Sequence, residues 1–148
     1  MIYFAQKAFV VRESSLLMVQ KSLDDPSQPG KWEVPGGRMD EGETIHDHIC
    51  REVFEETGIR ISPGAAFFVW DWKIPSCIED GSRDTVVAVA RFCKFLDGSE
   101  TNEYQIAGDF LASIRWVPLD EIDAMDIIPN MAPVIQEFHA SLRRNSIF

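Results

Sequence analysis

The chain has few cysteines, no long apolar run and no recognisable secretion signal. Only three of its 148 residues are cysteines, and Cys50, Cys77 and Cys93 form neither a CxxC pair nor a zinc-binding pattern. No apolar stretch approaches the ~18 residues that cross a bilayer, and the first residues lack the basic and apolar regions of a signal peptide. We therefore expect a cytoplasmic protein without a membrane partner, whose three thiols are buried or half-buried and unpaired.

Positive charge is also scarce. Lysine and arginine total 14 against 24 aspartates and glutamates, which gives a net charge of −10 at neutral pH. Such a surface repels a phosphate backbone, and the sequence contains no basic stripe to overcome that repulsion, so nucleic acid is not expected as a ligand. A small anionic substrate is still compatible with this charge if a metal ion neutralises the local carboxylates. The composition leaves monomer and homodimer equally open.

The residues that are present indicate one globular domain. The chain is 45% hydrophobic and 26% charged, has a length typical of single domains, and shows no linker or repeat, so residues 1–148 are predicted to form one domain. Thr44 and Gly58 have the residue types that begin and end a helix. Helices are predicted at 44–57 and 130–144, and strands at 5–12, 15–21, 32–37, 65–73, 84–95 and 114–117. This alternation favours an α/β domain with a mixed sheet.

The clearest chemical signal is a group of carboxylates on the first predicted helix. Glu52, Glu55 and Glu56 are spaced i, i+3 and i+4, so they lie within one turn of one helix face, where like charges repel. A hard cation such as Mg²⁺ or Mn²⁺ relieves that repulsion. A solvated acidic face, with Arg51 paired to Glu55, explains the same residues without a ligand.

The spacing around these residues resembles a known motif. Residues 37–59 read G-x5-E-x7-R-E-U-x-E-E-x-G-U, where U is a bulky aliphatic residue, and every fixed position of the Nudix box is filled. The passages WEVPGG at 32–37 and RWVPL at 115–119 are also similar to common passages of that family. The resemblance implies an α/β/α sandwich around a mixed sheet, and hydrolysis of a nucleoside diphosphate linked to another group.

The resemblance also implies roles for residues of this chain. The metal ligands would be the carboxylates of Glu52, Glu55 and Glu56 and the carbonyl of Gly36, with Mg²⁺ as the cofactor and Mn²⁺ as a substitute. Arg51 would orient the glutamates through salt bridges, including one with Glu43. Glu52 is the first choice for the general base that deprotonates water, and Glu55 is the second.

Some family members take a further acid from the loop before the late Trp-containing strand. In this chain no acid stands directly before that strand, and the nearest candidates are Asp109, Glu103 and Glu100.

The substrate is less well defined. Lys21 and Arg38 flank the glycine loop and are candidates for phosphate contacts, with solvated cations as the alternative. Asn130 resembles a base-reading asparagine of the branch that hydrolyses oxidised purine nucleotides, but it also suits a helix N-cap. In contrast, Pro75 stands where ADP-ribose hydrolases of the family often carry a proline. Trp70 and Trp72 share a strand face, where they can pack in the core or stack on a base.

We favour a (deoxy)nucleoside triphosphate, cleaved to the monophosphate and pyrophosphate. The alternatives are an ADP-ribose or nucleotide-sugar pyrophosphatase and, in a different class, a non-catalytic regulatory module that binds a nucleotide.

Overall fold

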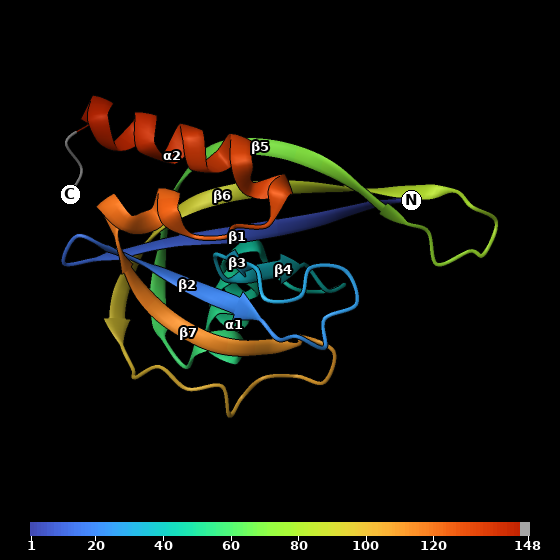
Figure 1. Ribbon diagram of the computed structural model, residues 1–148, viewed down its shortest axis with the longest axis horizontal. Coiled ribbons are helices and arrows are strands. Elements are labelled where there is room, and N and C mark those ends of the chain that lie inside the picture. Colours follow the sequence, from blue (N-terminus) through green and yellow to red (C-terminus); the bar gives the residue numbers. More distant parts are fainter. Residues whose placement is uncertain (146–148) are drawn as a thin grey trace.

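The computed structural model describes residues 1–145, which form one mixed sheet between two helices (Figure 1). The described chain contains seven strands in one sheet, whose main path runs β3-β2-β1-β6-β5, with β4 paired to β1 and β7 to β2. The strands are β1 (Ile2–Arg12), β2 (Ser15–Lys21), β3 (Trp32–Glu33), β4 (Gly36–Arg38), β5 (Arg60–Pro75), β6 (Arg83–Asp97) and β7 (Leu111–Pro118). The helices are α1 (Ile45–Thr57) and α2 (Ala132–Asn145), with short 3-10 turns at η1 (Leu119–Ala124) and η2 (Pro129–Met131). The predicted α/β sandwich with a mixed sheet is confirmed.

The centre of the sheet is strand β1. It runs parallel to β6, with Phe4 opposite Val87, and antiparallel to β2 and β4. The β1–β2 connection is the two-residue turn of Glu13 and Ser14, whose φ angles of 50° and 60° suit the twist of a tight hairpin. Because β1 is central, side chains on it reach both β4 and α1.

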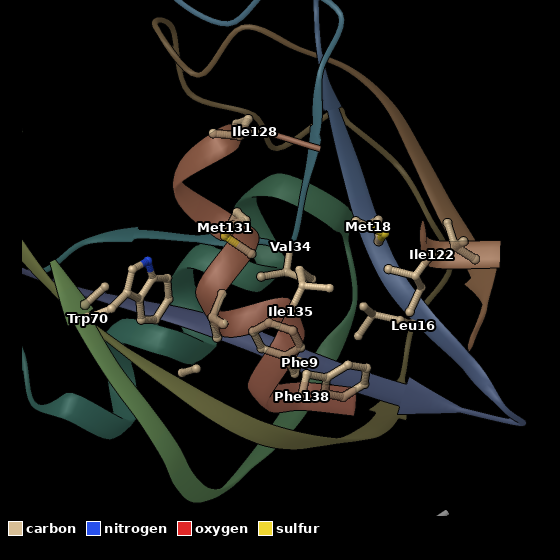
Figure 2. Close-up of a cluster of buried hydrophobic side chains, with 14 of the residues drawn as sticks. Phe9, Leu16, Met18, Val34, Trp70, Ile122, Ile128, Met131, Ile135 and Phe138 are labelled. Atoms are coloured by element: carbon tan, nitrogen blue, oxygen red, sulfur yellow. The ribbon is translucent and has the colours of Figure 1, made fainter. Parts of the chain in front are cut away.

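Alternation along β1 divides the core between the two faces. Phe9 contributes to an α2-side cluster, whereas Ala8 and Val10 belong to an α1-side cluster with Ile49 and Val53. Figure 2 shows the α2-side cluster, in which side chains of the sheet meet Met131, Ile135 and Phe138. The burial of both sheet faces makes the sheet a rigid support for the residues at its edge.

Helix α1 begins and ends where the sequence predicts. The Thr44 hydroxyl accepts a hydrogen bond from the Asp47 backbone N–H at 3.1 Å, and Gly58 adopts φ 75°, a left-handed helix end. Neither α1 nor α2, the helices of the described residues, has the length and apolarity that a membrane crossing requires.

Several predicted boundaries are wrong. Strand β5 begins at Arg60 instead of residue 65, because Pro63 lies at a register shift on an edge strand, where its missing N–H is tolerated. Helix α2 begins at Ala132, and Asn130 lies in the preceding η2 turn, so Asn130 is not the predicted N-cap. Cys77 is exposed between β5 and β6, contrary to the expectation of three buried or half-buried thiols.

Candidate active site

Strands β1 to β4, helix α1 and the loop before β7 meet around a polar cleft of about 410 Å³. We call this hollow the polar cleft. Its charged lining residues are Lys7, Lys21, Glu33, Arg38, Asp40, Glu52, Glu56 and Asp109. The rest of the lining comes from backbone-exposing glycines, among them Gly36 and Gly37. Of the predicted site residues, Glu52, Glu56, Lys21 and Arg38 therefore meet at one place.

Gly36 and Gly37 allow α1 to approach the sheet closely. Gly36 has φ 142°, and a Cβ atom built on it would lie 2.1 Å from the carbonyl oxygen of Gln6 on β1. A Cβ atom on Gly37 would lie 2.9 Å from both carboxylate oxygens of Glu52. Any larger residue would therefore push β4 away from β1, or Glu52 out of the cleft.

Glu52 and Glu56 point from α1 into the polar cleft. The carboxylate of Glu56 is buried and accepts a hydrogen bond from the Gly36 backbone N–H at 3.1 Å. Burial raises the pKa of Glu56 well above its usual range, although the ammonium of Lys7 opposes that effect. Burial also raises the pKa of Glu52, and the charges of Arg51 and Lys7 oppose it there.

Glu55 is directed to a different partner. Its Oε2 lies 3.0 Å from Nη1 of Arg51, one helical turn away, and Glu55 is not among the residues that line the polar cleft. The sequence spacing placed Glu55 on the same face as Glu52 and Glu56. The side chain of Arg51 explains why the structure does not gather all three.

Arg51 organises the acidic side chains beside the cleft. Its guanidinium makes a two-pronged contact with Glu43, from Nε to Oε2 at 2.6 Å and from Nη2 to Oε1 at 2.8 Å. Nη2 also lies 3.4 Å from Oε1 of Glu52. The hydrogen bonds from Arg51 lower the pKa of Glu43 to about 2. The predicted orienting role of Arg51 is compatible with this arrangement.

A buried ion pair beside the carboxylates was missed by the sequence reasoning. The ammonium of Lys7 on β1 hydrogen-bonds the carboxylate of Glu33 on β3, and both side chains are about nine-tenths buried. Lys21 Nζ lies 3.4 Å from the other oxygen of Glu33. Burial alone would lower the pKa of Lys7, but the charges of Glu33 and Glu56 raise it. The available signal was a lysine inside a mostly apolar strand.

The loop before β7 brings one acid to the cleft. Of the three candidates in the sequence, Asp109 lines the polar cleft, and its backbone carbonyl accepts a hydrogen bond from Lys21 Nζ at 3.3 Å. Glu100 lines a separate hollow, and Glu103 lies beside Tyr104. The structure thus selects Asp109 from the three.

A recess of about 370 Å³, lined about equally by polar and apolar atoms, continues from the polar cleft. We call it the apolar recess after the apolar side chains that the polar cleft lacks. It shares Lys7, Lys21, Gly37 and Arg38 with the polar cleft, and its further lining residues are Ala5, Ser27, Trp72, Ile74 and Val86. One end of the combined hollow therefore carries charges, and the other end carries an indole ring and aliphatic side chains.

The structure does not bring Asn130 to this hollow. Asn130 lines neither the polar cleft nor the apolar recess, and its backbone carbonyl accepts a hydrogen bond from Trp70 Nε1 at 2.9 Å. Trp70 itself is buried in the α2-side cluster, 5.7 Å from Trp72 between ring centroids. Trp70 therefore packs in the core, while Trp72 lines the recess and Asn130 lines neither hollow.

The charges of the polar cleft fit a divalent cation. Five carboxylates face three cationic side chains there, so ionisation of all of them leaves two negative charges in excess. Within residues 1–145, no three His, Cys, Asp or Glu side chains are close enough together to enclose a metal ion. Mg²⁺ does not need such a cage, because it is commonly bound by one or two carboxylates, with water and substrate phosphates as the other ligands. Glu52 and Glu56 are a donor set of that kind.

Comparison with known proteins identifies the family. The NUDIX domain matches residues 5–138, which is most of the chain and includes all of α1 and the first half of α2. The chain belongs to the Nudix family. The family resemblance of residues 37–59 is therefore confirmed, and Nudix hydrolases generally use a divalent metal.

Two relatives and one solved structure show what the chain is similar to. A MutT-like protein of Streptomyces ambofaciens is 30% identical over 113 residues, 76% of this chain, and the chain spans 62% of that protein's length. A putative 8-oxo-dGTP diphosphatase of Bacillus subtilis is 28% identical over 91% of this chain and 80% of its own. The crystal structure of a MutT protein from Methanosarcina mazei superposes with a TM-score of 0.75, 23% identity and coverage of 97% of this chain and 95% of its own. That structural likeness concerns the fold.

Proposed function

We propose that this Nudix chain is a divalent-cation-dependent pyrophosphohydrolase, which cleaves a (deoxy)nucleoside triphosphate to the monophosphate and pyrophosphate. The observation that carries the proposal is the continuity between the polar cleft and the apolar recess through Lys7, Lys21, Gly37 and Arg38. A nucleotide has the same division into a charged end and an apolar, stackable end. The names of the Bacillus and Streptomyces relatives agree with this choice.

The cations between the two hollows are the proposed phosphate ligands. Lys21 is held by Glu33 and by the Asp109 carbonyl, and the guanidinium of Arg38 lies 4.6 Å from the ring centre of Tyr3. Both cations are thus held in place before substrate binds, which lowers the entropic cost of contacting a phosphate chain. Trp72 in the recess is the proposed stacking surface for the base.

Glu52 and Glu56 are the proposed holders of Mg²⁺, or of Mn²⁺ in its place, together with the carbonyl of Gly36. The bound cation neutralises phosphate oxygens and lowers the pKa of attacking water. Glu55 acts through Arg51, because their ion pair restricts the position of the guanidinium that lies beside Glu52. Glu55 is therefore proposed as an indirect contributor to the metal site.

Glu52 is the proposed general base. It lines the cleft, and burial raises its pKa, which makes the carboxylate a better proton acceptor. Glu55 is a poorer base in this arrangement because its carboxylate is occupied by Arg51. Asp109, which also lines the cleft, is the second candidate.

We further propose that the chain acts in the cytoplasm on small nucleotides rather than on nucleic acid. The scarcity of basic residues supports that choice of partner. Monomer and homodimer are both compatible with a site that is built from one chain.

A substrate screen with Mg²⁺ and with Mn²⁺ tests the proposal. The panel contains canonical and 8-oxo-purine triphosphates, ADP-ribose and nucleotide sugars, with the released monophosphate and pyrophosphate as readouts. Turnover in ¹⁸O-labelled water is expected to place the label on a phosphate product. Preference for ADP-ribose would replace the triphosphate assignment, and nucleotide binding without turnover of any compound would favour a regulatory module.

A further inference from the structure

His48 is a fully buried polar residue of α1 that has no role in the reaction proposed for the polar cleft. Its Nδ1 lies 2.8 Å from Nε2 of Gln6, a fully buried residue of the central strand β1. The same Gln6 Nε2 lies 2.9 Å from the carbonyl oxygen of Ile45, at the start of α1. One amide group therefore contacts both the backbone and the imidazole ring.

These contacts determine which nitrogen of His48 carries the hydrogen. The Ile45 carbonyl can only accept a hydrogen bond, so Gln6 must present its NH₂ group on that side. The NH₂ group consequently donates to Nδ1 of His48 as well, and an accepting Nδ1 bears no hydrogen. An imidazole ring with an unprotonated Nδ1 is neutral and carries its hydrogen on Nε2.

The Nε2–H group is directed at acceptors on the cleft side of α1. Within residues 1–145, Nε2 has no partner at hydrogen-bond distance, and Oε1 of Glu52 lies 3.9 Å away. The backbone carbonyl groups of Gly37 and Arg38 also face the ring, as do the charges of Glu43 and Arg51. The Glu52 carboxylate is itself packed against Gly37. A buried N–H donor thus lies 3.9 Å from a carboxylate oxygen of Glu52.

We propose that His48 is a positioning residue for Glu52, held by Gln6 in the Nε2–H form with its donor aimed at the carboxylate. This inference rests on the proposed metal-binding role of Glu52. Arg51 Nη2 already lies 3.4 Å from Oε1 of Glu52. A second cationic side chain there would compete further with a metal ion, whereas a neutral imidazole restricts the carboxylate's orientation without adding positive charge.

Two conservative substitutions of His48 separate its contact with Gln6 from its donor toward Glu52. In His48→Gln the terminal amide nitrogen can replace Nε2, so the donor toward Glu52 is kept. In His48→Asn the shorter amide can replace Nδ1, so the contact with Gln6 is kept and the donor is lost. His46→Gln is the matched control, because His46 is exposed on the same helix. We expect Mn²⁺ affinity, measured by electron paramagnetic resonance, to be about 10-fold weaker in His48→Asn than in His48→Gln and unchanged in the control.

Nitrogen chemical shifts of the metal-free wild-type chain give an independent readout that needs no variant to fold. Long-range ¹H–¹⁵N spectra are expected to show a protonated Nε2 and an unprotonated Nδ1 for His48 at neutral pH. A protonated Nδ1 would overturn the inference, and so would equal Mn²⁺ affinities of the two variants. If the wild-type chain does not bind Mn²⁺, the proposed metal role of Glu52 is refuted instead. Failure of the proposed function can therefore be distinguished from failure of the inference about His48.

Discussion

Replacement of Lys7 tests whether the positive charge of the buried Lys7–Glu33 pair also offsets the negative charge of the proposed metal site. Lys7→Met removes the cation closest to Glu33 and leaves that buried carboxylate with Lys21, 3.4 Å away, as its remaining partner. Breaking a buried pair usually costs ~3–5 kcal/mol. We expect the lower end, ~3 kcal/mol, because Lys21 remains. For 148 residues, with an unfolding entropy of ~2.1 cal/mol/K per residue, this corresponds to a decrease in Tm of ~10 °C.

Divalent cation should offset part of this loss. Without Lys7 the polar cleft has a larger negative excess near Glu52 and Glu56, so Mg²⁺ should bind the variant more tightly than the wild type. Ligand at 100 times its dissociation constant stabilises a folded protein by ~2.7 kcal/mol. The increase in Tm between EDTA and saturating Mg²⁺ is therefore expected to be larger in Lys7→Met than in the wild type.

Lys31→Met is the matched control for this comparison. Lys31 pairs with Asp126 at 2.9 Å on the surface, where a salt bridge contributes ~1 kcal/mol or less. Scanning calorimetry of the three proteins, in EDTA and in Mg²⁺, supplies all six Tm values. The reasoning is refuted if Lys7→Met loses no more stability in EDTA than Lys31→Met, or if Mg²⁺ raises the Tm of the variant and the wild type equally.

Three further substitutions test other parts of the site. Glu56→Gln should lower kcat at least ~100-fold at saturating Mg²⁺, because a catalytic metal contributes several kcal/mol to transition-state stabilisation. The Tm in EDTA should not fall, because the change removes a buried charge. Full turnover by Glu56→Gln would contradict the metal site. The folded-state pKa of Glu43 is lowered to about 2 by Arg51, so its stabilisation is complete above the ordinary value of 4.5 and is lost as pH falls toward 2. Urea unfolding should therefore show a stability gap between wild type and Glu43→Gln that narrows over this window, and a constant gap would exclude the linkage. Asp109→Asn should lower kcat ~10–100-fold while Glu103→Gln does not, and equal rates for the two would remove Asp109 from the site.

Local signals explain why the helices and the carboxylates could be predicted from the sequence. Thr44 and Gly58 cap α1 through contacts with residues that lie three or four positions away, so the sequence alone specifies them. The i, i+4 spacing of Glu52 and Glu56 likewise requires only a helix to place them together. The same spacing does not determine where the Glu55 carboxylate points: it contacts Arg51 and does not line the polar cleft.

Contacts between distant segments explain what the sequence could not predict. Lys7 and Glu33 lie 26 positions apart, and they meet only because β1 and β3 flank β2 in the sheet. Asn130 showed the opposite problem: its residue type suited a base-reading or capping role, yet the η2 turn gives its carbonyl to Trp70. The position of Asp109 could not be predicted, because it depends on where the long loop before β7 passes the cleft.

The polar cleft takes its cations and its two proposed metal-holding carboxylates from different structural elements, and this difference predicts different kinetic roles. The cations Lys7, Lys21 and Arg38 stand on strands, whereas Glu52 and Glu56 stand on α1. A strand-borne cation contacts phosphate oxygens that are charged in both the ground state and the transition state, so its loss should weaken both equally. Lys21→Met is therefore expected to raise KM with little change in kcat, in contrast to the loss of kcat expected on the helix side. Steady-state kinetics at saturating Mg²⁺ distinguishes the two, and a fall in kcat with unchanged KM for Lys21→Met would place that lysine at the reacting phosphorus instead.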